Sequence, residues 1–137
     1  MAYFRPPFFV RRVFNPIAMR FGISGTQALA VRGRRSGEIR RVPVIPVDHD
    51  GARYLVSPRG ETQWARNLRA AGEAELRSKR RPPERVRATE VVVAERPPVI
   101  AAYRAVAGRA VASFFTTLPD PADHPVFRVE RAGRDAA

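Results

Sequence analysis

The side chains best suited to chemistry in this sequence are its arginines. Lysine and arginine together number 25, against 13 aspartate and glutamate residues, and Lys79 is the only lysine. The resulting formal charge of +12 implies an anionic partner, because such a field gathers anions. A guanidinium binds phosphate or carboxylate through two parallel hydrogen bonds. The partner classes to consider are therefore nucleic acid, a membrane surface and a phosphorylated cofactor.

Few other reactive groups are present. Cysteine is absent, which excludes thiolate catalysis, disulfides and thiolate metal sites. The two histidines, His49 and His124, belong to no spaced cluster of His, Asp and Glu, so we predict no metal site. They lie in an expected turn and in a proline-rich loop, and neither completes a Ser/His/Asp triad. No residue is therefore assigned as catalytic.

The length and composition of the chain predict a single cytoplasmic domain. A chain of 137 residues fits one domain of ordinary size. The hydrophobic content of 45% excludes general disorder, while 13 prolines and 9 glycines indicate short elements. Arg11, Arg12, Pro16 and Arg20 interrupt the apolar-rich N-terminal stretch, so we predict neither a membrane span nor a signal peptide.

Six short β-rich runs must position the arginines. We predict strands at residues 26–32, 39–47, 52–57, 74–78, 84–93 and 126–130. A loop bounded by Gly33 and Gly37 suits a hairpin between the first two runs, and residues 79–83 form the turn before the fifth. Pro43 and Pro46 place part of the second run at an edge or a bulge, since proline lacks the N–H that a central strand donates.

Two helices are predicted among the strands. One spans residues 62–71 and stops at Gly72, and its apolar face holds Trp64, Leu68 and Ala71. The other opens at residues 96–98, and its apolar face holds Val99, Tyr103, Val106 and Ala110. Short, mostly antiparallel strands with two helices favour an α+β, mainly β fold, in which partial closure into a barrel removes sheet edges.

The ends of the chain differ in composition from the strand-rich part. Residues 1–25 form an aromatic, basic arm, which we interpret as a helix with Asn15 as cap and Pro16 in its first turn. Closing one end of the core is the preferred role of the arm, and roofing a substrate or contacting a membrane surface stays open. We assign residues 26–130 to the barrel domain and residues 131–137 to a frayed tail.

Two segments carry a more specific signal. Residues 33–44 are GRRSGEIRRVPV, and residues 54–70 are YLVSPRGETQWARNLRA. In order and spacing they resemble the deazaflavin (F420)-dependent nitroreductase family, with its G-R-[RK]-S-G-x-x-R-x-x-P-[LV] hairpin and W-x-x-N-L-[RK]-A helix. Residues 124–129, HPVFRV, also look like members of this group.

The resemblance implies a fold, a cofactor and a reaction. The family has a split β-barrel of the flavin-binding, pyridoxamine-phosphate-oxidase-like type, is often dimeric and uses coenzyme F420. The implied reaction passes hydride from reduced F420 to a small hydrophobic electrophile such as a quinone, a nitro compound or an activated alkene. The cofactor supplies the reactive carbon, and the protein orients and desolvates it. The proton donor stays open between solvent, Ser57, Thr62 and Tyr103.

The resemblance also implies which residues bind the cofactor. F420 carries a phosphate and a tail of glutamates, and the residues matching the family's tail-binding hairpin are Arg34, Arg35, Ser36, Arg40 and Arg41. At least one of the last two points away from the ligand, because neighbouring strand residues face opposite ways, and a solvated strand residue is the alternative for Arg34 or Arg41. The residues matching the loop along the deazaflavin ring are Val56, Ser57, Pro58, Arg59 and Gly60.

Trp64 and Asn67 match the helix that follows this loop. Core packing is an equal alternative for Trp64, and holding the loop is the preferred role of Asn67. Ala65 stands where many relatives carry an aromatic residue, which leaves the acceptor open. Some relatives bind flavin mononucleotide or haem, so these remain alternatives to F420. A basic nucleic-acid-binding module is a further alternative, but no aromatic residues interleave with the arginines as base stacking requires, so no nucleic acid is expected.

Overall fold

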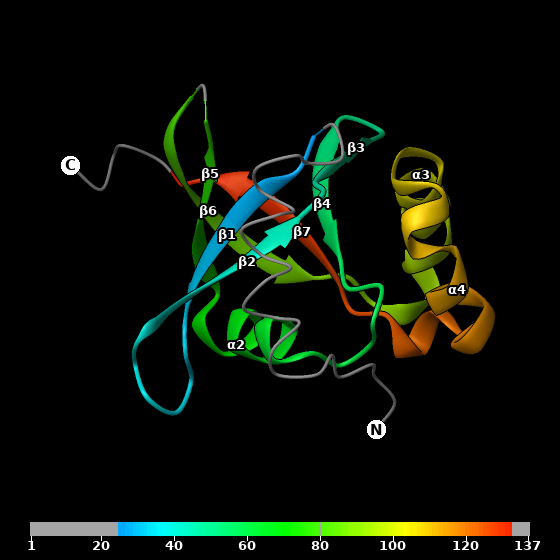
Figure 1. The fold of residues 1–137 in the computed structure, drawn as a ribbon, viewed down its shortest axis with the longest axis horizontal. Coiled ribbons are helices and arrows are strands. Elements are labelled where there is room, and N and C mark those ends of the chain that lie inside the picture. The colour runs from blue at the N-terminus through cyan, green and yellow to red at the C-terminus, as the bar shows by residue number, and fades with distance from the viewer. Residues whose placement is uncertain (1–24, 80, 133–137) are drawn as a thin grey trace.

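The computed structural model describes residues 25–79 and 81–132 of the chain. Seven antiparallel strands form one curled sheet, with three short helices against it (Figure 1). The strands are β1 (Gln27–Arg32), β2 (Ile39–Val44), β3 (Val47–His49), β4 (Ala52–Val56), β5 (Glu73–Ser78), β6 (Arg81–Glu90) and β7 (Val126–Arg131). The helices are α2 (Gln63–Ala71), α3 (Arg96–Ala107) and α4 (Arg109–Thr117), with 3-10 turns at Val93–Glu95 and Pro121–Asp123. The predicted mainly β, partly closed barrel is confirmed.

The run predicted as one strand over residues 39–47 is divided between the two edges of the sheet. The strand order is β2-β1-β5-β6-β7-β4-β3, so the chain leaves one edge at Val44 and enters the other at Val47. Val44 packs inside the curled sheet, whereas Ile45 and Val47 pack outside it. Pro46 has no N–H to continue the ladder, which accounts for the break. The bend at this corner brings the two edges round into a half-barrel.

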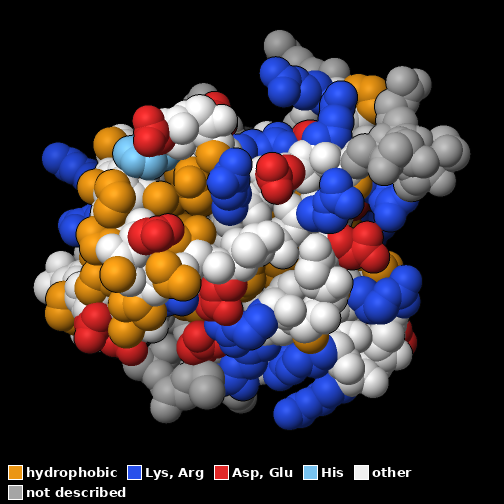
Figure 2. Space-filling view, turned by 180° about the vertical axis from the view of Figure 1, so that it is seen from behind, with side chains coloured by type: hydrophobic (Ala, Val, Ile, Leu, Met, Phe, Trp, Pro, Cys, Tyr) orange, Lys and Arg blue, Asp and Glu red, His pale blue; other side chains and the backbone are white. Residues whose placement is uncertain are grey.

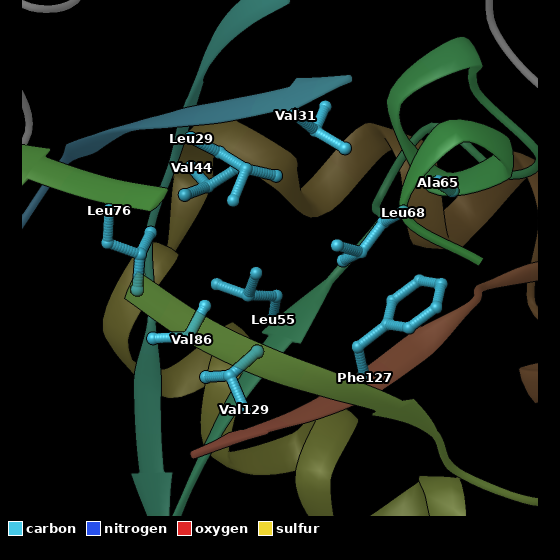
Figure 3. Packing of buried hydrophobic residues seen from close by; sticks show 10 residues of the cluster. All are labelled: Leu29, Val31, Val44, Leu55, Ala65, Leu68, Leu76, Val86, Phe127 and Val129. Atoms are coloured by element: carbon cyan, nitrogen blue, oxygen red, sulfur yellow. The ribbon is translucent and has the colours of Figure 1, made fainter. Parts of the chain in front are cut away.

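The inner face of the sheet is filled by a single apolar cluster. Its buried members point toward one another from six strands and α2 (Figure 3). They are Leu29, Val31, Val44, Leu55, Ala65, Leu68, Leu76, Val86, Phe127 and Val129. Leu68 of α2 is fully buried in this cluster, so α2 covers one end of the half-barrel. Burying these side chains stabilises the curled sheet by roughly 25 cal/mol for each Å² of apolar surface removed from water.

Helix α2 ends before Gly72 as predicted and begins one residue later than predicted, after Thr62. The Thr62 hydroxyl accepts from the Ala65 N–H at 3.4 Å, and Gly72 ends the helix in the left-handed conformation with φ 73°. The predicted apolar face is right for Leu68 and wrong for Ala71, which is exposed. Ala65 is buried instead of Ala71, because the first two turns of α2 pack against the sheet and its C-terminal end does not.

Helices α3 and α4 pack on the outside of the sheet. They bury a second cluster against β3, β4 and β7 that includes Val56, Val99, Tyr103 and Phe115. The sequence predicted one helix with Val106 and Ala110 on its buried face, and this was wrong. Gly108, with φ 59° and ψ −134°, separates the two helices, and both predicted residues are exposed. The buried stripe of α3 runs instead through Ile100 and Ala107.

The hairpin between β5 and β6 is longer than predicted. Residues 79–83 were expected to form a turn, but β6 begins at Arg81 and includes Pro82 and Pro83. The register shifts between the Ser78–Arg81 pair and the Leu76–Glu84 pair, which inserts one extra residue into β6. Proline is accommodated at such a bulge because the ladder needs no N–H from it there.

The predicted N-terminal arm lies almost entirely outside the described residues. The expected helix with its Asn15 cap, and the open roles of roof and membrane contact, fall in that part of the chain. Of the helices in the described part, none has the length and apolar character needed to cross a bilayer.

Candidate cofactor-binding site

The loop between β1 and β2 has a fixed shape held by its own backbone. The Gly33 N–H donates to the Glu38 carbonyl at 2.7 Å, and the Gly37 N–H donates to the Gly33 carbonyl at 2.9 Å. A Cβ on Gly33 would lie 3.1 Å from Ser36 Oγ and 3.2 Å from the Glu38 oxygen, so a side chain here would require these neighbours to shift. Ser36 Oγ accepts from the Glu38 N–H at 3.1 Å. The arginines at the tip of the loop are therefore presented on a rigid base.

Arg34 and Asn67 tie this loop to α2. The side-chain oxygen of Asn67, which is buried, accepts from the Arg34 backbone N–H at 3.1 Å and from its Nη1 at 2.8 Å. The same Nη1 donates to Gln63 Oε1 at 3.0 Å. Asn67 thus fixes a loop, the role preferred from sequence, although the loop it holds is the hairpin and not the one before α2. Arg34, a predicted cofactor ligand, uses its guanidinium for this contact.

Four other arginines of the hairpin are exposed, and one of them, Arg32, donates from Nη1 to the Gly37 carbonyl at 2.7 Å. Arg35, Arg40 and Arg41 have no carboxylate partner among the residues that the structure describes. In the ladder Arg40 lies opposite Val31, whose side chain faces inward, and Arg41 lies opposite Ala30 on the other face. The two neighbouring arginines therefore point to opposite faces of the sheet.

Most arginines on the other strands contrast with those of the hairpin, because they pair with glutamates, although Arg81 and Arg87 of β6 have no such pair among the described residues. The pairs there are Arg53–Glu84, Arg77–Glu75, Arg85–Glu73, Arg128–Glu130 and Arg131–Glu84. Positive charge without such a partner is thus available at the hairpin for an anionic ligand.

The loop between β4 and α2 is anchored from inside. Ser57 is fully buried, and its Oγ donates to the Gly60 carbonyl at 2.6 Å and lies 3.1 Å from Thr62 Oγ1. The Ser57 N–H donates to the Pro125 carbonyl at 2.9 Å. Val56 packs into the outer cluster. Of the predicted ring-binding residues, Val56, Ser57 and Gly60 can therefore reach a ligand only through their backbone, whereas Pro58 and Arg59 are half-exposed.

The three side chains left open as proton donors are all buried. Ser57 is inaccessible, Thr62 caps α2, and Tyr103 is 3% exposed within the outer cluster. Burial also raises the pKa of the Tyr103 hydroxyl, which makes it a poorer acid. The arrangement favours solvent as the source of the proton.

Arg59 and Phe114 form a contact that the sequence did not indicate. The guanidinium carbon of Arg59 lies 5.2 Å from the centre of the Phe114 ring of α4, within range of a cation–π interaction. Partial burial lowers the pKa of Arg59. The contact places a half-buried cation and an aromatic ring beside the β4–α2 loop, joining segments that no local pattern relates.

Trp64 serves the core as well as bordering the loop. Its ring packs against Phe127 with centres 6.3 Å apart and planes tilted by 48°, and it borders the inner cluster. Trp64 is half-buried. One side of its indole therefore packs in the core, which is one of the two roles considered from the sequence.

His124 is a structural anchor that sequence reasoning missed. It is fully buried, its Nδ1 lies 3.0 Å from the Ser57 carbonyl oxygen, and its Nε2 contacts the Leu118 carbonyl oxygen. Its ring stacks on Phe115 with centres 4.3 Å apart. The family-like HPVFRV segment was the only feature of the sequence that pointed to His124, and it did not predict which groups the histidine contacts. No group of three His, Asp or Glu side chains suited to a metal occurs among the described residues.

A family model decides which family this chain belongs to. The model of the F420H2-dependent quinone reductases matches residues 8–114. The chain belongs to this family. It is therefore an F420H2-dependent reductase with coenzyme F420 as its cofactor, and the predicted resemblance is confirmed. Among curated proteins, none matches the chain.

Solved structures agree with this family on the fold. An "F420-H2 Dependent Reductase (FDR-A)" is 23% identical with a TM-score of 0.58, covering 78% of this chain and 95% of its own. The Agrobacterium tumefaciens protein Atu2129, described as of unknown function, is 23% identical with a TM-score of 0.58, and the match covers 95% of this chain. This reductase spans only 58% of the length of Atu2129. A structure described as a domain-swapped dimer is 20% identical with a TM-score of 0.58, covering 89% and 97% of the two chains.

Proposed function

We propose that this reductase holds the anionic tail of F420 on the β1–β2 hairpin and passes hydride to a small hydrophobic acceptor, with a quinone as the first choice. The observation that carries the proposal is the set of three exposed guanidiniums, those of Arg35, Arg40 and Arg41, on a hairpin whose loop has a fixed shape. A phosphate and several glutamates require such fixed cations. Nitro compounds and activated alkenes are further candidate acceptors.

The residues around the site fit the cofactor in distinct roles. Arg35 and Ser36 would bind phosphate or carboxylate at the hairpin tip, with Arg40 or Arg41 extending the basic surface on one face. Arg34 and Asn67 would hold the hairpin in place through α2. In the β4–α2 loop, residues 56–60 would border the deazaflavin ring, mostly through backbone groups. Trp64 would border the same ring from the start of α2.

The protein's own contribution to the reaction is orientation and exclusion of water. When bound, F420 supplies a hydride donor, so the chain needs no nucleophile or metal of its own. Fixed loops hold the reacting partners close together, which can contribute several kcal/mol to lowering the barrier. Reducing a quinone by hydride places negative charge on an oxygen, and the half-buried cation of Arg59 beside the β4–α2 loop would stabilise that charge. Solvent then supplies the proton.

An apolar surface supports a hydrophobic acceptor. Figure 2 shows hydrophobic side chains gathered over one side of the molecule, where α3 and α4 lie. Exposed valines there include Val92, Val93 and Val106, at 62%, 45% and 51% exposure. Phe114 of α4 connects this side with Arg59 of the β4–α2 loop. An apolar, planar acceptor would approach the ring from this side.

A homodimer is part of the proposal. The structurally similar domain-swapped dimer supports it, and β2 and β3 each leave one edge of the described sheet unpaired. Sedimentation velocity should give twice the mass of one chain, and a protomer-sized particle at all concentrations would contradict it.

The proposed function is tested by equilibrium binding of oxidised F420 against flavin mononucleotide. We expect the deazaflavin to bind more tightly, because its glutamate tail adds carboxylates that flavin mononucleotide lacks. Reduced F420 should then transfer two electrons to a soluble benzoquinone, which is followed by the rise in absorbance of oxidised F420. Protein that purifies yellow with stoichiometric flavin, or that fails to bind F420, would overturn the proposal.

The role of the hairpin is tested by Arg35→Ala. We expect F420 affinity to fall about tenfold or more, because a charge-assisted hydrogen bond contributes roughly 1.5–3 kcal/mol. The matched control is Arg81→Ala, which removes the same charge from an exposed position in the β5–β6 hairpin. Fluorescence titration at one ionic strength measures both variants. Equal losses would mean that the overall field, and not this loop, holds the tail.

A further inference from the structure

Arg69 is the basic residue of the W-x-x-N-L-R-A segment, and the site described so far gives it no role. Its guanidinium lies between two carboxylates. Toward Glu61 its Nη1 and Nη2 donate at 3.1 and 2.9 Å, and toward Glu90 its Nε and Nη2 donate at 2.7 and 2.9 Å. Glu61 belongs to the β4–α2 loop and Glu90 ends β6. One side chain of α2 therefore bridges two other elements with paired hydrogen bonds.

The bridge continues through buried residues back to the same loop. Glu90 Oε2 also accepts from Arg96 Nη2 at 3.2 Å. Arg96, which is 6% exposed, donates from Nη1 to the His124 carbonyl at 3.2 Å. The His124 ring lies 3.0 Å from the Ser57 carbonyl oxygen. Residues 57–61 are thus held at one end by His124 and at the other by Arg69, through a closed circuit of polar contacts.

We propose that Arg69 is a positioning residue for the cofactor, because it closes this circuit and so fixes residues 57–61 in the conformation that receives the deazaflavin ring. The inference rests on the proposed function of that loop. Arg69 itself does not face the hairpin arginines, and it acts through Glu61.

The electrostatics of the circuit explain why a cation is needed at this position. Glu61 and Glu90 share one guanidinium, so without it their like charges repel. The hydrogen bonds from Arg69 hold the pKa of Glu90 below its ordinary value. Arg96 is the other cation that faces Glu90, but it does not reach Glu61. Losing Arg69 therefore frees Glu61, and with it the outer end of the loop.

The experiment compares Arg69→Gln with Arg53→Gln in the full chain. Arg53 also makes a bidentate pair, donating to Glu84 at 3.0 and 2.8 Å, but it contacts no residue of the loop. For Arg69→Gln we expect the Kd for oxidised F420 to rise about fivefold, the loss equivalent to roughly 1 kcal/mol. The KM for F420H2 should rise with it, while the KM for the quinone stays within twofold. Arg53→Gln should leave F420 affinity within twofold.

Two further variants separate geometry from charge. Arg69→Lys keeps the positive charge but has a single nitrogen that cannot bridge two carboxylates in paired fashion, so we expect it to recover less than half of the lost affinity. Adding Glu61→Gln to Arg69→Gln should weaken binding no further, because the two residues act through one contact. Full recovery in Arg69→Lys, or equal losses in Arg53→Gln, would overturn the inference. If the unaltered chain does not bind F420, the proposed function fails instead.

Discussion

Replacing Phe127 with alanine should lower the free energy of unfolding by about 3–5 kcal/mol, the usual cost of deleting a buried aromatic ring. Phe127 is 1% exposed and lies among the inner cluster (Figure 3). Its ring packs against Trp64. It sits on β7 opposite Leu55 of β4 and Glu90 of β6. The cavity would open where β4, β6 and β7 meet under α2. None of these strands can move inward without breaking backbone hydrogen bonds to its neighbours.

Urea unfolding followed by circular dichroism measures this loss, and Trp64 fluorescence reports on the same site. The control is Phe127→Leu, which keeps most of the apolar volume and should cost about 1–1.5 kcal/mol. An alanine variant within 1 kcal/mol of the unaltered protein would show that the ring is not packed as described.

Replacing Arg96 with alanine should destabilise the fold by about 3–5 kcal/mol, because it removes a buried cation that satisfies several acceptors. Arg96 is 6% exposed at the start of α3. Its Nε donates to the Val91 carbonyl at 2.9 Å, and its Nη1 donates to the carbonyls of Pro121 and His124 at 3.2 Å each. Without it these oxygens lose a donor in a region that water reaches poorly.

The matched control for Arg96 is Arg104→Ala, on the same helix. Arg104 is exposed, and its guanidinium carbon lies 5.0 Å from the centre of the Phe115 ring. Its loss should cost no more than about 1 kcal/mol. Thermal and urea unfolding of both variants decide the matter. Equal losses of stability in the two variants would mean that the buried hydrogen bonds of Arg96 contribute no more than an exposed arginine does.

Local features that the sequence specifies are those made by residues close together in the chain. The β1–β2 hairpin follows from glycines four positions apart, at 33 and 37, and the end of α2 follows from its terminal glycine. Pro43 on the edge strand β2 is also as predicted, because a missing N–H is tolerated there. The motif pair at residues 33–44 and 54–70 was sufficient for the family.

Contacts between segments that lie far apart in the chain could not be predicted from the sequence. The hydrogen bonds from Arg34 to Asn67 join residues 33 positions apart, and the contact of Ser57 with His124 joins residues 67 apart. Whether a guanidinium binds ligand or neighbour depends on which acceptors the fold brings within about 3 Å, and residue type alone does not specify that. Arg34 and Arg35 are identical in type and adjacent, yet only Arg34 meets α2.

The sequence by itself therefore determined the basic, cysteine-free composition, the short strands, the hairpin and the family. Only the tertiary structure decided that residues 39–47 divide at Pro46 between two sheet edges, that Gly108 separates α3 from α4, and that Val106 faces outward. It also decided the polar circuit that joins Arg69 to the loop at residues 57–61. The physical reason is that burial and hydrogen-bond pairing are properties of the packed whole, to which each local pattern contributes only a preference.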